Sequence, residues 1–131
     1  MTTSLVIGAN RGIGFELAKQ LSGAGHDVIA TFRQSAGELE SLDVRRIGGV
    51  DIADEAGVKT LLDGLGDTPL DNVLIVSGIL RRGGLDNPAY DDVLAQFVVN
   101  SVGPLRAAAA LHGRIHKGGR IAILTLSLIH I

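Results

Sequence analysis

The amino-acid sequence predicts an α/β fold in which a doubly wound parallel sheet lies between two layers of helices. Short apolar segments alternate with helical apolar stripes along the whole chain, as expected for right-handed βαβ units. Hydrophobic residues make up 46% of the chain but aromatic residues only 3%, so the core is aliphatic, as in buried parallel strands. The 18 glycines among 131 residues, roughly twice the usual share of ~7%, supply tight turns between such elements.

The first part of the chain is expected to form two strands around one helix. Residues 4–7 are a short apolar run that Gly8 stops, which predicts a buried strand. An apolar stripe at helical spacing predicts the first helix over residues 12–23. Residues 26–32 predict the second strand, and a polar, turn-rich stretch over residues 33–43 follows.

The middle of the chain repeats this alternation. Residues 44–50 predict a weaker third strand, because two glycines interrupt it. Asp54 is expected to cap a helix that ends near residue 65. Residues 72–76 are the most apolar run and predict the fourth strand.

The last part predicts one long helical segment and a fifth strand. The helical pattern covers residues 88–117, and Gly103 and Pro104 should kink or divide it. Residues 119–126 predict the fifth strand. The whole order of elements is that of a three-layer α/β/α domain.

Composition excludes several classes of protein. The net charge of −2 argues against a surface built to hold nucleic-acid phosphates. With no cysteine, disulfides and thiolate metal sites are excluded. The sequence shows no secretory signal, and no stretch approaches the roughly 18 apolar residues of a membrane span. We therefore expect a cytoplasmic protein whose residues 1–131 form a single domain.

The sharpest motif is a glycine loop between the first strand and the first helix. Gly8 would allow the tight turn, Gly12 would let a pyrophosphate approach the backbone, and Gly14 would let the helix pack closely on the strand. The alternative is that these glycines only end a strand for steric reasons. The candidate cofactor-binding residues of the loop are Gly8, Asn10, Arg11, Gly12, Ile13 and Gly14.

The spacing G-x-x-x-G-x-G resembles the short-chain dehydrogenase/reductase family, whose cofactor loop is T-G-x-x-x-G-x-G. Ile7 stands where the family usually has threonine. The resemblance extends over residues 4–125. It implies an NAD(P)-binding Rossmann-like fold that is truncated after the fifth strand, and an oxidoreductase activity at the level of the family.

Two further positions match the family's pattern. Asp51 and Ile52 resemble an Asp-Val/Leu pair whose carboxylate hydrogen-bonds the adenine amino group; the alternative is that Asp51 caps the next helix. Asn100 resembles the asparagine of the fourth helix, which holds a water in the proton relay of active members; the alternative is a solvent-facing side chain. The resemblance makes Asn100 the one candidate catalytic residue of this chain.

The exit of the fourth strand matches only in part. Residues 71–79 are similar to the family's D-x-L-V-N-N-A-G-I, but Ile75 and Val76 replace the two asparagines. Ser77 replaces the alanine, and Gly78 is retained. Ser77 and Gly78 are the candidate cofactor-binding residues at the end of the fourth strand.

The end of the second strand bears on the choice of nucleotide. In the family, an acidic residue here binds the ribose 2′-OH of NAD, whereas this chain has Phe32 followed by Arg33. Arg33 and Arg11 suit a 2′-phosphate, because guanidinium groups bind phosphate oxygens in pairs. The alternative is that Arg33 is a solvated loop residue. NADP(H) is therefore favoured over NAD(H).

The family's proton-transfer pair is absent from these residues. Members carry Tyr-x-x-x-Lys on the helix after the fifth strand and a serine earlier than this pair, whereas the one tyrosine here is Tyr90, with Leu94 four residues on. Leu126 occupies the place of the serine, and Ser127 comes one residue late. The 131-residue chain alone is therefore predicted to be inactive.

A metal site is not expected. His112 and His116 have the i, i+4 spacing of helical metal ligands, but no acidic residue or cysteine stands near them. A basic helix end, which suits the helix dipole, is the simpler interpretation.

The leading hypothesis is an NADP(H)-dependent oxidoreductase of short-chain type that acts, in a full-length form, on a small carbonyl or alcohol. The alternatives are an NADP(H)-binding regulatory or redox-sensing module without turnover, and an inactive fragment. No nucleic-acid or membrane partner is expected, and a homo-oligomer stays open.

Overall fold

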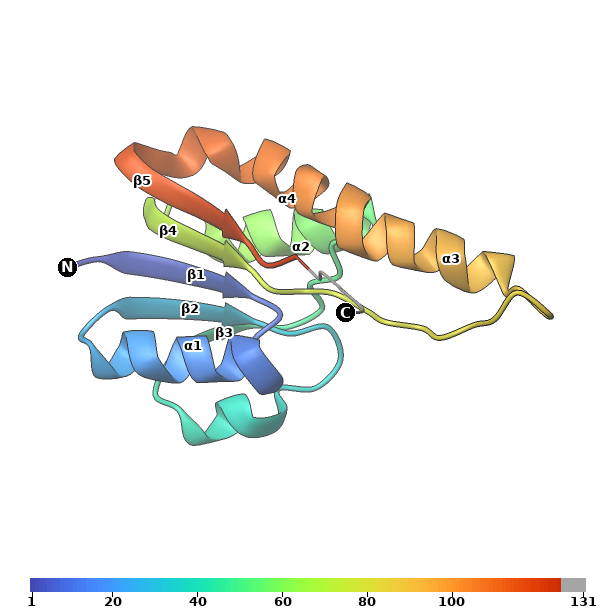
Figure 1. Cartoon of the computed structure of the whole chain (residues 1–131). Coiled ribbons are helices and arrows are strands. Elements are labelled where there is room, and N and C mark those ends of the chain that lie inside the picture. The colour runs from blue at the N-terminus through green and yellow to red at the C-terminus, as the bar shows by residue number, and fades with distance from the viewer. Residues whose placement is uncertain (126–131) are drawn as a thin grey trace.

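The computed structural model describes residues 1–125, and five parallel strands form one sheet in the order β3-β2-β1-β4-β5 (Figure 1). The chain runs outward from β1 to β3 and then crosses to β4 and β5 on the other side of β1, which confirms the doubly wound sheet and puts its switch point between β1 and β4. The strands are β1 Thr3–Ile7, β2 Asp27–Thr31, β3 Arg45–Ile47, β4 Leu70–Ile75 and β5 Ile115–Ile123.

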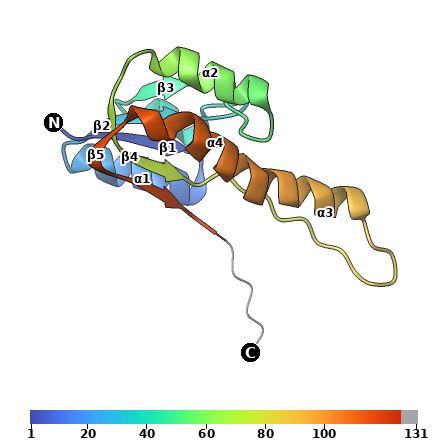
Figure 2. The same cartoon turned by 90° about the horizontal axis from the view of Figure 1, so that it is seen from above.

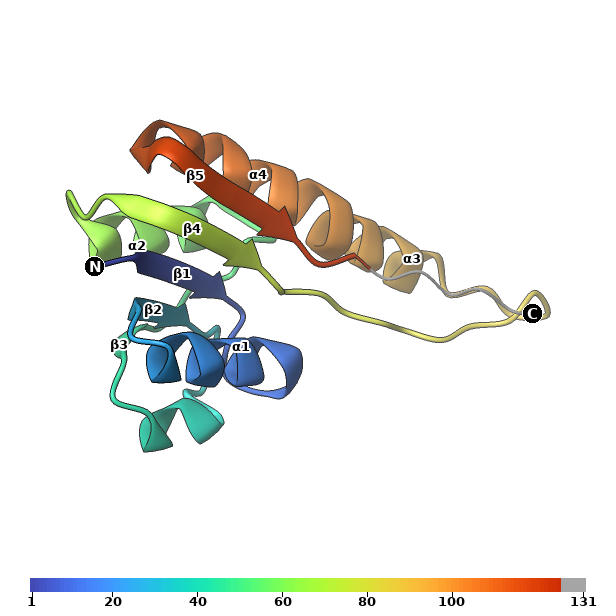
Figure 3. The same cartoon turned by 60° about the vertical axis from the view of Figure 1, so that its left-hand side comes forward.

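Helices cover the two faces unequally, as Figure 2 shows. α1 (Gly12–Gly23) and a 3-10 turn (Gly37–Ser41) lie on one face, whereas α2 (Glu55–Leu65) and α4 (Gly103–Leu111) lie on the other. α3 (Tyr90–Phe97) projects beyond the sheet and has no buried residue. In Figure 3, α1 lies beside β1 and β2, and within residues 1–125 no helix covers β4 and β5 on that face.

Strand alternation sorts the apolar side chains into two clusters. Leu5, Ile29 and Val73 are register partners across three strands, and all three pack in the cluster that contains α2 and α4. Val6 points to the opposite face, where it packs with Ala18 of α1. Because side chains alternate along a strand, both faces of β1 and β2 are buried. All strand pairs are parallel, so the carboxyl ends of the strands meet at one edge.

Polar groups at the amino edge of the sheet bond to one another. The buried Ser4 Oγ lies 2.8 Å from His26 Nδ1 and accepts a 3.2 Å hydrogen bond from Asn72 Nδ2. The Thr3 amide donates to Asp71 Oδ2 at 2.8 Å. These bonds satisfy groups that would be costly to bury unpaired.

β5 begins four residues before the predicted strand. It starts at Ile115, whose register partner is Leu70, and a bulge separates this pair from the next one. Gly118 has a φ of 87°, so a glycine conformation makes this polar segment compatible with the strand. The predicted extension of the long helix to residue 117 is wrong: α4 ends at Leu111, and a 3-10 turn (His112–Arg114) precedes β5.

The long helix is not divided at Gly103 and Pro104. Residues Val98–Val102 instead form a π-helical turn, and the Gly103 amide donates to the Val98 carbonyl five residues back. Pro104 has no amide hydrogen to donate, and the wider turn lets the helix continue without that hydrogen bond.

The stretch Tyr90–Arg114 is long and apolar enough to cross a membrane by length and composition, which corrects the expectation that no segment has these properties. The second half of this stretch packs against the rest of the domain, since four of its residues are buried: Gly103, Pro104, Ala107 and Leu111.

Candidate cofactor site

The glycine loop starts with a turn that only glycine fits. Gly8 has a φ of 85°, and a Cβ there would lie 2.6 Å from Ser77 Oγ. The exits of β1 and β4 therefore touch at the switch point of the sheet. The Gly8 amide donates to Thr31 Oγ1 at 3.2 Å, and the Ala9 amide donates to the Thr31 carbonyl at 2.8 Å, so the end of β2 holds the loop as well.

The other two loop glycines have opposite surroundings. A Cβ at Gly14 would lie 2.0 Å from the Gly8 carbonyl oxygen, so α1 starts in direct contact with the turn. Gly12 has a φ of 59°, and nothing lies within 4 Å of its Cβ position. Gly14 therefore serves packing, whereas Gly12 leaves open space in front of the helix.

The first turn of α1 is open to a ligand. Arg11 occupies the N-cap position, its side chain makes no capping hydrogen bond, and the first turn contains no acidic residue. Helix N-termini with free amides and a positive dipole end attract anions. Ile13 is exposed beside this turn, and the Asn10 carbonyl faces the turn at Gly37, where a Cβ would lie 2.9 Å from its oxygen.

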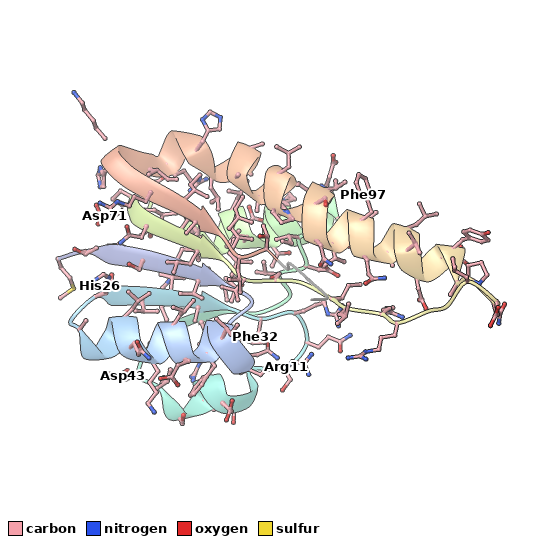
Figure 4. The ribbon with its side chains drawn as sticks, in the orientation of Figure 1. Arg11, His26, Phe32, Asp43, Asp71 and Phe97 are labelled. Atoms are coloured by element: carbon pink, nitrogen blue, oxygen red, sulfur yellow. The ribbon has the colours of Figure 1, made fainter. Side chains whose placement is uncertain are left out.

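The end of β2 presents an aromatic residue and a cation. Phe32 is half-buried against Gly48, where a Cβ would come within 2.7 Å of the ring, and Arg33 is exposed. Figure 4 shows Arg11 and Phe32 at the carboxyl edge of the sheet and His26 at the opposite edge. The positions predicted to select the nucleotide therefore share one edge with the glycine loop.

The loop after β3 is built from backbone contacts around Asp51. One of its carboxylate oxygens, Oδ1, accepts from the Ala53 amide at 2.9 Å, while Asp54 caps α2 through the Gly57 amide at 2.6 Å. Capping thus belongs to Asp54. Ile52 is 2% exposed, so the side chain of this candidate residue lies in the core and its backbone carries any contact with a ligand.

Asn100 joins the long helix to the exit of β4. Its Nδ2 donates to the Ile79 carbonyl at 2.7 Å, and its Oδ1 accepts from the Ile79 amide at 2.8 Å. A Cβ at Gly78 would lie 3.3 Å from Asn100 Oδ1. The side-chain amide of Asn100 therefore holds the segment Ser77–Ile79 in place. Both of its polar atoms bond to the backbone of Ile79.

Comparison with known proteins agrees with this geometry. A family model described as enoyl-(acyl carrier protein) reductase matches residues 8–130. The chain belongs to the short-chain dehydrogenase/reductase family. This membership confirms the resemblance carried by the glycine loop.

Individual relatives of this short-chain dehydrogenase/reductase are longer than the chain. A 1-hydroxy-2-glutathionyl-2-methyl-3-butene dehydrogenase of Rhodococcus sp. (strain AD45) is 31% identical over 127 residues, which are 95% of this chain and 56% of the relative. A short-chain dehydrogenase/reductase of Pestalotiopsis microspora is 27% identical and aligns with 97% of this chain and 52% of its own length. The chain thus spans about half the length of these curated relatives.

Solved structures of the family share its fold. A carbonyl reductase from Pseudomonas aeruginosa PAO1 in complex with NADP superimposes with a TM-score of 0.85 at 27% identity. The match covers 94% of this chain and 60% of the reductase.

Sequence reasoning missed one residue that shapes the site. Thr31 is fully buried at the end of β2 and accepts from the Gly8 amide. A hydroxyl at the last position of an otherwise apolar strand was a visible signal for it.

The remaining residues singled out in the sequence do not contribute to the described site. Tyr90 is exposed at the start of α3, and Ser127 and Leu126 fall outside the described residues. His112 lies in a 3-10 turn and His116 in β5, so they do not share a helix face. A surface hollow of about 480 Å³, lined in part by Asp67 and Arg114, lies at the amino edge and is not the candidate site.

Proposed function

We propose that this chain binds NADP(H), in preference to NAD(H), as the nucleotide-binding part of an oxidoreductase that acts on a small carbonyl or alcohol. The open first turn of α1 carries the proposal: nothing lies within 4 Å of a Cβ position at Gly12, and the side chain of the N-cap residue Arg11 makes no capping hydrogen bond. A dinucleotide pyrophosphate fits such a cradle in shape and charge.

Each part of the cofactor has candidate partners in this chain. The amides at the start of α1 would hold the pyrophosphate, and the Asp51 carboxylate would accept from the adenine amino group. The exposed guanidiniums of Arg11 and Arg33 would hold a 2′-phosphate, which a carboxylate at the end of β2 would repel. When bound, the nicotinamide supplies or accepts the hydride. The solved relative in complex with NADP supports this choice of nucleotide.

We further propose that the 131-residue chain binds the cofactor without turnover. These residues contain no Tyr-x-x-x-Lys, and Leu94 follows the single tyrosine, Tyr90, by four positions. Without that pair, residues 1–131 lack the family's side chains that move a proton at the substrate oxygen. In a longer form that supplies the pair, residues 1–131 would act as the nucleotide-binding domain.

Titration with NADPH, followed by its fluorescence, tests the proposal. We expect saturable binding below millimolar cofactor and no NADPH oxidation with a panel of aldehydes and ketones. Absence of binding at millimolar NADPH would overturn the assignment of the site, and turnover would overturn the predicted inactivity. A Tyr-x-x-x-Lys segment encoded after residue 131 would favour the oxidoreductase over a non-catalytic binding module.

The choice between the two nucleotides depends on Arg33. Arg33→Asp should weaken NADPH binding by about tenfold, because charge-assisted bonds to the phosphate are lost and a like charge is gained, while NADH binding changes little. Lys19→Asp makes the same charge change on the exposed side of α1 and serves as the control. Equal effects of Arg33→Asp on the two nucleotides would rule out a 2′-phosphate contact.

A further inference from the structure

One side chain of α4 reaches the loop that follows β3. Arg106 is half-buried, and its Nη1 donates to the Ile52 carbonyl at 2.8 Å. Gly103, one turn earlier, faces the same residue: a Cβ there would lie 3.0 Å from Ile52 Cγ1. The helix and the loop are therefore in contact through both a charged hydrogen bond and close packing.

This contact holds the backbone next to Asp51. The Ile52 carbonyl belongs to the same peptide unit as the Ala53 amide, which donates to Asp51 Oδ1 at 2.9 Å. The chain is also tight there, because a Cβ at Gly57 would lie 1.9 Å from the Asp51 carbonyl oxygen. A guanidinium bond to a carbonyl is stronger than a neutral one, so Arg106 fixes the peptide that sets the direction of the Asp51 carboxylate.

The same helical segment holds the other exit loop. Asn100 bonds to both backbone groups of Ile79 after β4, and Arg106 bonds to Ile52 after β3. Two side chains of one continuous helical segment thus hold backbone groups at two places along the carboxyl edge.

We propose that Arg106 is a positioning residue for the adenine half of the nucleotide site, acting through the Ile52 carbonyl on the Asp51 carboxylate. This inference rests on the proposed function. In this role Arg106 holds the turn in the shape that presents the second carboxylate oxygen of Asp51, Oδ2, to the adenine.

Binding of cofactor fragments to variants of the full chain tests the inference. Arg106→Met keeps the aliphatic stem and removes the donor. It should weaken the binding of NADPH and of 2′,5′-ADP by the same factor, about fivefold or more. The binding of reduced nicotinamide mononucleotide should not change. Arg106→Lys retains a cationic donor and should restore most of the affinity.

Arg114→Met is the matched control. Arg114 is also half-buried and also donates to a backbone carbonyl, that of Gly66, but at the amino edge of the sheet. Equal losses in both methionine variants would assign a general structural role and overturn the inference, as would unchanged 2′,5′-ADP binding in Arg106→Met or an equal loss of the nicotinamide fragment.

Two further outcomes stay distinguishable. If Arg106→Met shows no cooperative unfolding transition, Gly103→Ala is the second variant, because its methyl group would press on Ile52 from the same helix. It should give the same selective loss of 2′,5′-ADP binding. Unchanged binding of 2′,5′-ADP in Gly103→Ala overturns the inference. If the unmodified chain binds neither NADPH nor 2′,5′-ADP at millimolar concentration, the proposed function itself fails.

Discussion

Gly12 and Gly25 share a left-handed backbone but differ in what lies in front of them. Their φ angles are 59° and 88°, and neither has an atom within 4 Å of its Cβ position. Alanine at either residue should cost about 1–2 kcal/mol of folding free energy, because L-residues are strained in this region. Only Gly12→Ala places a methyl group before the open turn of α1, so it alone should weaken NADPH binding, by roughly tenfold or more.

Urea unfolding and NADPH titration of the two variants separate strain from contact. Similar losses of stability together with unequal losses of affinity are expected. If Gly25→Ala weakens NADPH binding as much as Gly12→Ala does, the effect comes from backbone strain. In that case the phosphate does not lie close to Gly12.

At the scale of single residues, sequence predicts well what depends on neighbours in the chain. The Asp54 cap and the positive φ of Gly8 follow from local pattern and are present. Two other features depend on where the long helical segment from α3 to α4 packs, which no local pattern contains. These are the burial of Ile52 and the two hydrogen bonds between the Asn100 side chain and the Ile79 backbone.

At the scale of elements, the cap of α2 decides how firmly the loop after β3 is held. Asp54→Ala removes the 2.6 Å bond to the Gly57 amide and should lower the free energy of unfolding by about 1 kcal/mol, as for other N-cap deletions. Asp54→Ser keeps an acceptor and should recover most of it. Urea unfolding followed by circular dichroism measures both.

Asp63→Ala supplies the control on the same helix. Asp63 Oδ2 accepts a hydrogen bond from the exposed Lys59 ammonium, and this bond, together with the charge of Asp63, raises the pKa of Lys59. A raised pKa means that this exposed pair adds to stability at neutral pH and loses its effect as the pH rises through that pKa. Asp63→Ala should therefore cost less than Asp54→Ala at pH 7; the reverse order would contradict a dominant cap.

Elements were predictable where apolar periodicity was clean and failed where it was not. α1 and α2 have the expected bounds. The sequence predicts a start of β5 that is too far along the chain, because the polar residues His116 and Lys117 interrupt the apolar pattern there. The first pair of this strand, Ile115 with Leu70, is set by tertiary contact. Gly103 and Pro104 predict a kink or a division of the long helix, and the helix instead continues through the π-helical turn Val98–Val102, with both residues buried.

At the scale of the molecule, three exposed apolar side chains lie close together on α3. Val93 and Phe97 are 59% and 60% exposed and one turn apart, with Leu94 beside them, and Figure 4 shows Phe97 pointing away from the sheet. Contiguous apolar surface of this kind marks an interaction site. We expect the chain to self-associate through α3, with a mass above 13.6 kDa that rises with concentration in light scattering.

Phe97→Asp tests this surface, because a charge in a packed apolar contact opposes association. The variant should elute and scatter as a monomer at concentrations at which the unmodified chain does not. Leu85→Asp is the control, since Leu85 is 99% exposed but lies in the loop before α3, and it should leave the mass unchanged. If Ile123→Asp abolishes association while Phe97→Asp does not, the contact runs through the half-exposed edge strand β5, whose outer side is open to pairing, and the role of α3 is refuted.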